Sequence, residues 1–325
     1  MPTKRSPRKG SMQVWPRKRA KSETVRVRSW AKSKDAKPLG FPGYKAGMTH
    51  ILITDNRANS ITKGEDIRFP VTVIECPPIK LIGFTLYKKD AYGLHASSQI
   101  LADKLDKELA KKFPLPKKSK KKVSDVKIEE YADLMLLVQT QPKLTGIGKK
   151  KPEIFELGIG GDLNAKFDFV KNNLGKELKV EDVLQEGMLL DSHAVTRGKG
   201  FQGPVKRFGV AIRQHKSEKT KRGPGSLGPW HGKLNWTVSN AGQMGYHQRV
   251  DYNKWLLKIG NKPEEINPKG GFLHYGDVKN NYILVKGSIQ GPAKRMIKLI
   301  QAVRPDPKVP KEAPAISYVS LEAKQ

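Results

Sequence analysis

Residues 194–250 combine the residue types that suit contact with a polyanion. The stretch contains ten glycines and eleven Lys or Arg residues, and Glu218 is its single carboxylate. Glycine lets a backbone approach another surface closely and adopt positive φ, and cations without opposing carboxylates favour phosphate groups. Trp230, His231 and Trp236 add flat rings that can stack on nucleobases. The pattern predicts a segment that packs inside folded nucleic acid.

Two shorter strings refine this interpretation. In Arg197-Gly-Lys-Gly-Phe-Gln-Gly203 the two cations alternate with glycine, so an extended backbone places both on one side. Residues 219–231 form a proline-stiffened tip that ends at Trp230. The alternatives are a solvated loop for the first string and a core anchor for Trp230. Trp236 and Trp255 fit a core position better, because apolar residues lie beside them.

The residues that we expect to contact RNA carry basic or planar side chains and lie in two regions, 5–28 and 197–249. They are Arg5, Arg8, Lys9, Trp15, Arg17, Lys18, Arg19, Arg26, Arg28, Arg197, Lys199, Lys206, Arg207, Arg213, Lys219, Lys221, Arg222, Trp230, His231, Trp236, His247 and Arg249.

The sequence contains no obvious catalytic site or metal site. The seven histidines lack ligand spacing, and carboxylates concentrate in the middle of the chain, away from the basic segment. Gly158-Ile-Gly-Gly161 lacks the Lys-Ser/Thr of a phosphate loop and is interpreted as a plain turn. The single cysteine, Cys76, is interpreted as a buried apolar residue on a strand. We therefore expect no catalytic residue, no metal site and no cofactor.

The overall charge requires a permanent anionic partner. The chain has 325 residues and a formal net charge of +31, which would cost a free protein compactness through self-repulsion. Nucleic acid is the first candidate and an anionic membrane surface a distant second. RNA is preferred to DNA, because irregular glycine-rich segments with isolated aromatic residues suit folded RNA and no DNA-binding motif appears. We find no transmembrane run and no signal peptide in residues 1–10.

The elements that must position these residues are mostly strands. β-rich runs between turn-forming residues occupy 46–54, 70–75, 81–87, 134–140, 188–196, 251–259, 271–275, 282–286 and 296–301. The tail from Arg304 is spaced by prolines until residues 316–321. The first three predict one antiparallel sheet or barrel. Helical spacing predicts helices over 97–112, from Ile100, Leu101, Leu105 and Leu109, and over 164–174 and 180–185.

The chain divides into regions of different composition. Residues 1–40 form a basic N-terminal extension that should be disordered alone in water, although Trp15 and Trp30 suggest burial against a partner. Residues 41–94 and 187–303 form a β-barrel body that includes a basic finger, 197–250. Residues 95–186 form an α/β insertion, whose lysine-rich run 117–122 faces solvent or RNA, and residues 304–325 form a C-terminal tail.

Several strings resemble ribosomal protein family three of the large subunit, in its archaeal and eukaryotic branch. They spread over most of the chain in the family's order, and together they are highly specific. They are Gly40-Phe-Pro-Gly-Tyr-Lys-Ala-Gly-Met-Thr-His50, Val195-Thr-Arg-Gly-Lys-Gly-Phe-Gln-Gly203, Pro229-Trp-His231, Ala241-Gly-Gln-Met-Gly-Tyr-His-Gln-Arg249, Gly270-Gly-Phe-Leu-His-Tyr-Gly276 and Val285-Lys-Gly-Ser-Ile-Gln-Gly-Pro292.

The resemblance implies a mostly β fold with an α/β insertion: a six-stranded β-barrel of the translation-factor type with a long basic N-terminal extension and an internal finger loop. It implies a structural role in the large subunit of the cytoplasmic ribosome, binding near the 3′ end of ribosomal RNA, and early action in subunit assembly. The finger would reach toward the peptidyl-transferase centre, with Trp230 at its tip. Large-subunit proteins fourteen and twenty-four would be neighbours, with no membrane and no homo-oligomer.

One position departs from the eukaryotic pattern. Eukaryotic members carry a modifiable histidine before the tip, whereas this chain has Thr220-Lys-Arg-Gly223, with Lys221 at that place. A histidine-dependent modification therefore does not carry over. Two rival functions remain: an RNA-modifying enzyme, which would need a cofactor pocket or paired carboxylates, and a DNA-architectural protein, which would bind duplex DNA as tightly as structured RNA.

Overall fold

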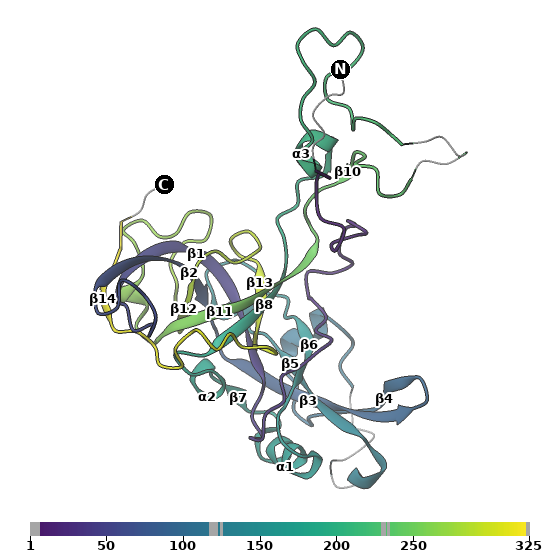
Figure 1. Cartoon of the computed structure of the whole chain (residues 1–325). Helices are drawn as coiled ribbons and strands as arrows, with labels where there is room; N and C mark the ends of the chain where they lie inside the picture. Colours follow the sequence, from purple (N-terminus) through teal and green to yellow (C-terminus); the bar gives the residue numbers. More distant parts are fainter. Residues whose placement is uncertain (1–6, 117–122, 124–125, 229–231, 233–234, 323–325) are drawn as a thin grey trace. The chain divides into compact units, whose positions relative to one another are not determined.

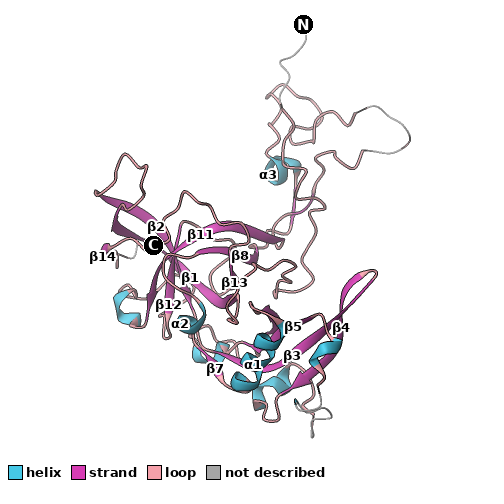
Figure 2. Ribbon diagram, turned by 60° about the horizontal axis from the view of Figure 1, so that its bottom comes forward, coloured by secondary structure: helices cyan, strands magenta, loops and turns pink. Residues whose placement is uncertain are grey.

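The computed structural model describes residues 7–116, 123, 126–228, 232 and 235–322. The chain forms two compact units. The first comprises Met1–Ser22 and Val195–Arg249, and the second comprises Glu23–Ala194 and Val250–Gln325. Strands dominate and helices are few and short (Figure 2). The expected mostly β composition is thereby confirmed.

Most of the elements are labelled in Figure 1. The strands are β1 (Gly40–Thr54), β2 (Asp66–Glu75), β3 (Ile79–Asp90), β4 (Gly93–Leu101), β5 (Asp133–Gln139), β6 (Ile154–Gly158), β7 (Glu177–Leu178), β8 (Leu189–Val195), β9 (Phe201–Gln202), β10 (Gly242–Gln243), β11 (Gln248–Gly260), β12 (Tyr282–Lys286), β13 (Met296–Gln301) and β14 (Ile316–Val319). The helices are α1 (Leu163–Asn173), α2 (Val180–Val183), α3 (Pro204–Phe208) and the short 3₁₀ turns η1 (Lys107–Lys111), η3 (Ile128–Glu130), η4 (Pro142–Leu144) and η5 (Pro263–Glu265).

Six strands close into a ring. Their order is β13-β8-β11-β12-β2-β1, and β1 pairs in turn with β13, antiparallel, from Gly40 opposite Ile300 to Tyr44 opposite Met296. The far end of β1 pairs with β14. Closure satisfies the backbone groups that an open sheet leaves at its edges. Because β1 is 15 residues long, it can serve both β13 and β14 along one side.

A second antiparallel sheet follows the order β4-β3-β5-β6, and β7 pairs with β3. This corrects the prediction that 81–87 joins the first two strands in one sheet. The turn between β2 and β3 carries the chain out of the ring, and β3 then pairs with β5 along its length. Helix α1 packs on this sheet, where Phe167 meets Phe84 edge-on at 6.0 Å between ring centroids. One apolar cluster continues from the ring into this sheet.

Two predicted elements are wrong. The helix predicted over 97–112 is replaced by β4 and η1, because Ile100 is buried in register with Phe84 of β3. The strand predicted over 271–275 is a tight turn, in which the amide of Phe272 donates to the carbonyl of Gly276. His274 has φ of 61° there. Non-local pairing and turn geometry override local spacing in these two cases.

The N-terminal extension is divided between the two units. Residues 23–39 belong to the second unit, where Val25 and Leu39 are buried. Pro38 forms a bridge with Ile159, and the Trp30 ring lies against Gly158. A Cβ atom on Gly158 would lie 2.6 Å from the Trp30 ring. The turn 158–161 therefore packs against the N-terminal segment 23–39. The backbone amides of Gly160 and Gly161 donate hydrogen bonds to the carbonyls of residues 37 and 33 in that segment.

Cys76 is buried directly after β2, where burial raises the pKa of its thiol above the ordinary value. Its interpretation as a small core residue is confirmed. Trp255, also expected in the core, is 3% exposed, and its indole N–H donates to the carbonyl of Gly187 at 3.1 Å. Within the described ranges, no helix combines the length and apolar character needed to cross a membrane.

Candidate nucleic-acid interface

The first unit is built around one buried aromatic ring. Phe208 closes helix α3, which begins at Pro204 and is terminated by Gly209 at φ 71°. Proline at the first helical position and glycine just past the end are standard boundary residues. The Phe208 ring stacks on Trp15 of the N-terminal segment, 5.5 Å between centroids and 24° between planes. Residues 193 positions apart in sequence thus share a small apolar cluster.

Two arginines hold this cluster together. The guanidinium of Arg17 lies 4.2 Å from the centre of the Phe208 ring, and that of Arg207 lies 5.0 Å from it. Arg17 donates to the carbonyl of Arg207 at 2.8 Å. Arg207 donates to the carbonyls of Asn240 at 2.9 Å, Gln243 at 3.0 Å and Arg17 at 3.3 Å. The Arg207 guanidinium therefore joins three chain segments through main-chain acceptors.

Further main-chain contacts fix the N-terminal segment. The amide of Ala20 donates to the carbonyl of Tyr246 at 2.8 Å. His247 is buried, and its Nδ1 lies 2.8 Å from the carbonyl oxygen of Lys18. A carbonyl can only accept, so Nδ1 carries the proton and Nε2 keeps a lone pair. His247 thus helps to hold the N-terminal segment in place.

The cations in this cluster raise one another's electrostatic free energy. Burial, followed by the charge of Arg8, lowers the pKa of Arg17. Burial and then the charge of Arg17 lower the pKa of both Arg207 and Arg249. Burial also lowers the pKa of His247, which favours the neutral ring near pH 7. Like charges share a partly desolvated space, and a bound anion would relieve their repulsion.

Most of the predicted RNA contacts in the first unit are exposed. These are Arg8, Lys18, Arg19, Arg197, Lys199, Lys206, Arg213, Lys219, Lys221 and Arg222. Lys9, Trp15, Arg17, Arg207 and Arg249 are partly buried, and His247 is buried. Arg26 and Arg28 are exposed but belong to the second unit. Arg5, Trp230, His231 and the run 117–122 lie outside the described residues.

Trp236 is 66% exposed, so the expectation that it lies in the core is wrong. Its ring meets that of Trp15 edge-on, with 5.7 Å between the ring centroids. Phe201, which follows Lys199 closely, is 77% exposed. It was absent from the list of expected contacts, although its place among glycines and cations was a usable signal.

The role of Phe208 could not be read from the sequence, because its partner Trp15 lies in a distant segment. No helix was predicted there, although Pro204 at the start of α3 and Gly209 just past its end were a usable signal. Among the described residues, no three His, Cys, Asp or Glu side chains are grouped as a metal ion would require. The arrangement offers cations, exposed rings and glycine-rich backbone, groups whose chemistry suits phosphates and bases.

Comparison with known proteins assigns the whole chain to one family. The family model described as Ribosomal protein L3 matches residues 1–325. The chain is similar to the large ribosomal subunit protein uL3 of Methanobrevibacter smithii, 47% identical over 98% of both chains. It is also similar to those of Methanocaldococcus jannaschii, 47% identical over 98% of this chain and 97% of the relative, and Archaeoglobus fulgidus, 46% identical over 98% of both. The chain belongs to the ribosomal protein L3 family.

Proposed function

We propose that this chain is a structural constituent of the large ribosomal subunit that binds large-subunit ribosomal RNA through its first unit. In detail, it binds near the 3′ end of that RNA, supports early subunit assembly, and reaches toward the peptidyl-transferase centre with the finger loop of residues 197–250. Membership of a ribosomal protein family gives its location as the cytoplasmic ribosome and its role as structural, not enzymatic.

The separation of charge between the two units carries the proposal. The first unit holds nineteen Lys or Arg residues and one carboxylate side chain, Glu218. Eighteen of the 31 net positive charges therefore lie in fewer than a quarter of the residues. The second unit mixes both signs. A polyanion is the ligand that neutralises such a surface, and each phosphate contact releases counterions.

The shape of the first unit favours structured RNA over duplex DNA. Apart from Val195, which ends β8, and residues 248–249, which begin β11, its described part is irregular backbone with one short helix, α3, and one two-stranded ladder, β9 with β10. Proteins that read duplex DNA sequence in the major groove insert a helix or ribbon there, and a five-residue helix is too short for that task. Exposed Phe201 and Trp236 suit unpaired, splayed bases.

Finer features of the family remain part of this proposal. The six-strand ring would be the translation-factor-type barrel. The domains would be the extension 1–40, the body 41–94 with 187–303, the insertion 95–186 and the tail 304–325, with large-subunit proteins fourteen and twenty-four as neighbours. Arg5, Trp230 and His231 would extend the contact surface. The RNA-modifying enzyme is not supported, because the family is one of ribosomal constituents.

Binding of the full-length chain to large-subunit RNA tests the proposal. Transcripts of the 3′ and 5′ halves and a duplex DNA of equal length would be titrated at several salt concentrations, followed by nuclease footprinting. We expect preference for the 3′ half and loss of affinity for Lys199→Gln and Arg213→Gln, but not for Lys269→Gln on the second unit. Equal binding to duplex DNA, or equal loss in all three variants, would contradict the proposal.

A further inference from the structure

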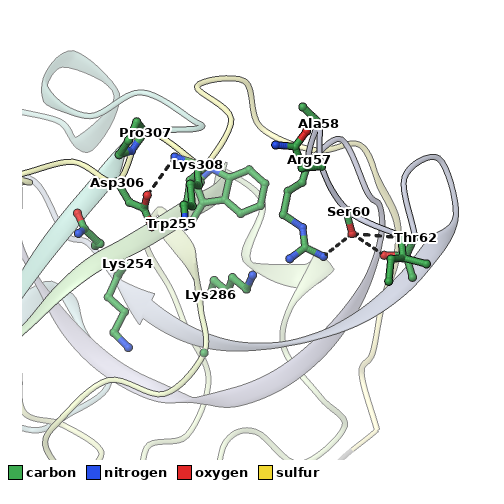
Figure 3. A pocket seen from close by; sticks show the side chains of 15 residues that line it. Arg57, Ala58, Ser60, Thr62, Lys254, Trp255, Lys286, Asp306, Pro307 and Lys308 are labelled. Atoms are coloured by element: carbon green, nitrogen blue, oxygen red, sulfur yellow. Dashed lines mark hydrogen bonds between the residues drawn. The ribbon is translucent and has the colours of Figure 1, made fainter.

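The second unit contains a cavity of about 1120 Å³ that the proposed function leaves unused. Four segments line it: the loop 57–62, the β11 residues 253–255, residues 286–287 at the end of β12, and the turn 306–309 (Figure 3). Its volume is slightly above the range of typical ligand pockets, about 300–1,000 Å³. All of these segments lie within one unit, so the cavity is a feature of that unit alone.

The cavity floor holds a cation with no ion-pair partner among the residues that the structure describes. The ammonium of Lys286 lies 3.9 Å from the centre of the Phe69 ring and 5.8 Å from that of Trp255. In Figure 3 it points toward the side on which Arg57 lies. Burial, and then the charge of Arg57, lowers the pKa of Lys286, and the charge of the Asp55 carboxylate opposes this only in part. Ring faces compensate part of its lost hydration, and a carboxylate would compensate more.

The other basic residues that line the cavity differ in whether they form ion pairs. Arg57 pairs with Asp55 at 2.8 Å, and Lys254 pairs with Asp251 at 2.8 Å. Lys308 is exposed at the rim, where its backbone amide donates to Asp306. Among the described lining residues, Arg57 and Lys254 are therefore already paired with carboxylates, and Lys286 and Lys308 are the cations available to an incoming ligand.

The rim also carries an exposed apolar side chain that could receive an aliphatic group of a partner. Ile61 is fully exposed, at 103%. A branched aliphatic side chain cannot stack on a base, but it packs well against another aliphatic side chain. The aromatic residue among the described lining residues, Trp255, is only 3% exposed. Stacking of bases on exposed rings, the usual source of single-strand affinity, is therefore not offered here.

The charge pattern also distinguishes this cavity from the first unit. Asp306 lines it directly, and the ion pairs of Asp55 and Asp251 stand beside it. The first unit has a single carboxylate in its whole sequence. These carboxylates would repel the repeated charges of a phosphate backbone, whereas a protein segment can place one carboxylate at Lys286 and apolar groups elsewhere.

We propose that this cavity docks an acidic, partly aliphatic segment of a neighbouring protein, with a carboxylate on Lys286 and an aliphatic side chain on Ile61. The inference rests on the proposed function, because the neighbour is met in the assembled large subunit. The partner is defined by chemistry: one Asp, Glu or C-terminal carboxylate within a few residues of Leu, Ile or Val.

The first experiment uses full-length chain with benzoylphenylalanine in place of Ile61, assembled into large subunits and irradiated. A second chain carries the photoreactive residue in place of Tyr92, which is also fully exposed but lies outside the cavity. We expect the first chain to cross-link to a protein segment of the stated composition, and the second not to cross-link to that segment. If neither chain enters the large subunit, the proposed function fails. If the chains enter but position 61 reacts only with RNA, or with nothing, the docking inference fails.

The second experiment measures affinity. The cross-linked segment is synthesised as a peptide and titrated against full-length chain in moderate salt, which suppresses weak surface attraction. Lys286→Gln should weaken binding about tenfold, because one charge-assisted contact at a half-buried site is lost. Lys104→Gln, an exposed lysine outside the cavity, should leave the affinity unchanged. Equal affinities in the two variants, with both folded by circular dichroism, would overturn the proposal.

Discussion

Replacing Phe208 by alanine should detach the N-terminal segment 1–22 of the first unit from its other segment, 195–249. The ring is 6% exposed. Burial of a phenylalanine contributes about 1.5–3 kcal/mol, and its stacking on Trp15 about 0.5–1.5 kcal/mol more. The cations of Arg17 and Arg207 over the same ring add about 0.5–1 kcal/mol each. These contributions overlap, and a loss of about 3–5 kcal/mol matches the usual cost of removing a buried phenylalanine.

Hydrogen exchange at Ala20 reports this loss, because its amide donates to the carbonyl of Tyr246 across the two segments. If the segment detaches locally, a 3 kcal/mol loss corresponds to a protection factor about 150-fold lower. Phe201→Ala is the matched control, since Phe201 lies in the same unit but is 77% exposed. A fall of less than about tenfold in Phe208→Ala, or an equal fall in Phe201→Ala, would refute the assignment of Phe208 as the centre of the unit.

Three further results follow from single residues. Burial lowers the pKa of Lys298 to about 7, below its unfolded value, so the unfolded chain binds more protons between pH 7 and 10.5. Stability of the second unit should therefore rise with pH from 7 to 9.5, by at most about 1.4 kcal/mol per unit, and Lys298→Met should remove this rise in denaturant titrations. Gly158→Ala should lower the melting temperature by displacing Trp30, whereas Gly146→Ala, whose added Cβ meets only ordinary contacts, should not. Lys199→Gln should reduce the salt slope of RNA affinity by about 0.7–0.9, measured by filter binding.

The local sequence correctly predicted those strands whose apolar residues alone indicate which positions are buried. β5, β8, β12 and β13 were expected within two residues of their ends, because their β-branched and leucine-rich runs fit a sheet in any context. Helix α1 was also predicted, because the helical spacing of its apolar residues can be recognised without knowing any distant contact. The structure of residues 97–112 was predicted wrongly. Ile100 is buried by pairing with Phe84 of β3, a contact that the helical spacing of nearby apolar residues does not reveal.

The chemistry of the interface was readable, but its internal structure was not. Composition identified the basic residues, yet nothing in it separates Arg17 and Arg207 from their exposed neighbours. Their distinct role depends on a contact between residues 190 positions apart. The sequence also suggested that the two basic segments lack enough apolar material to hold a shape alone. Trp15 and Phe208 show that each segment supplies half of a small cluster.

This cluster explains why folding of the first unit and binding of RNA should be linked. Arg17 and Arg207 pack on one ring while each is partly desolvated, and Arg17 lowers the pKa of Arg207 by its charge. The folded unit therefore holds more repulsion than the open one, and an anion that binds only the folded form offsets it. At a ligand concentration 100 times the dissociation constant, this linkage stabilises the folded form by about 2.7 kcal/mol. Protection of Ala20 should then rise about 100-fold when RNA is added. Protection that is already maximal without a polyanion would mean that the ring contacts alone overcome the repulsion.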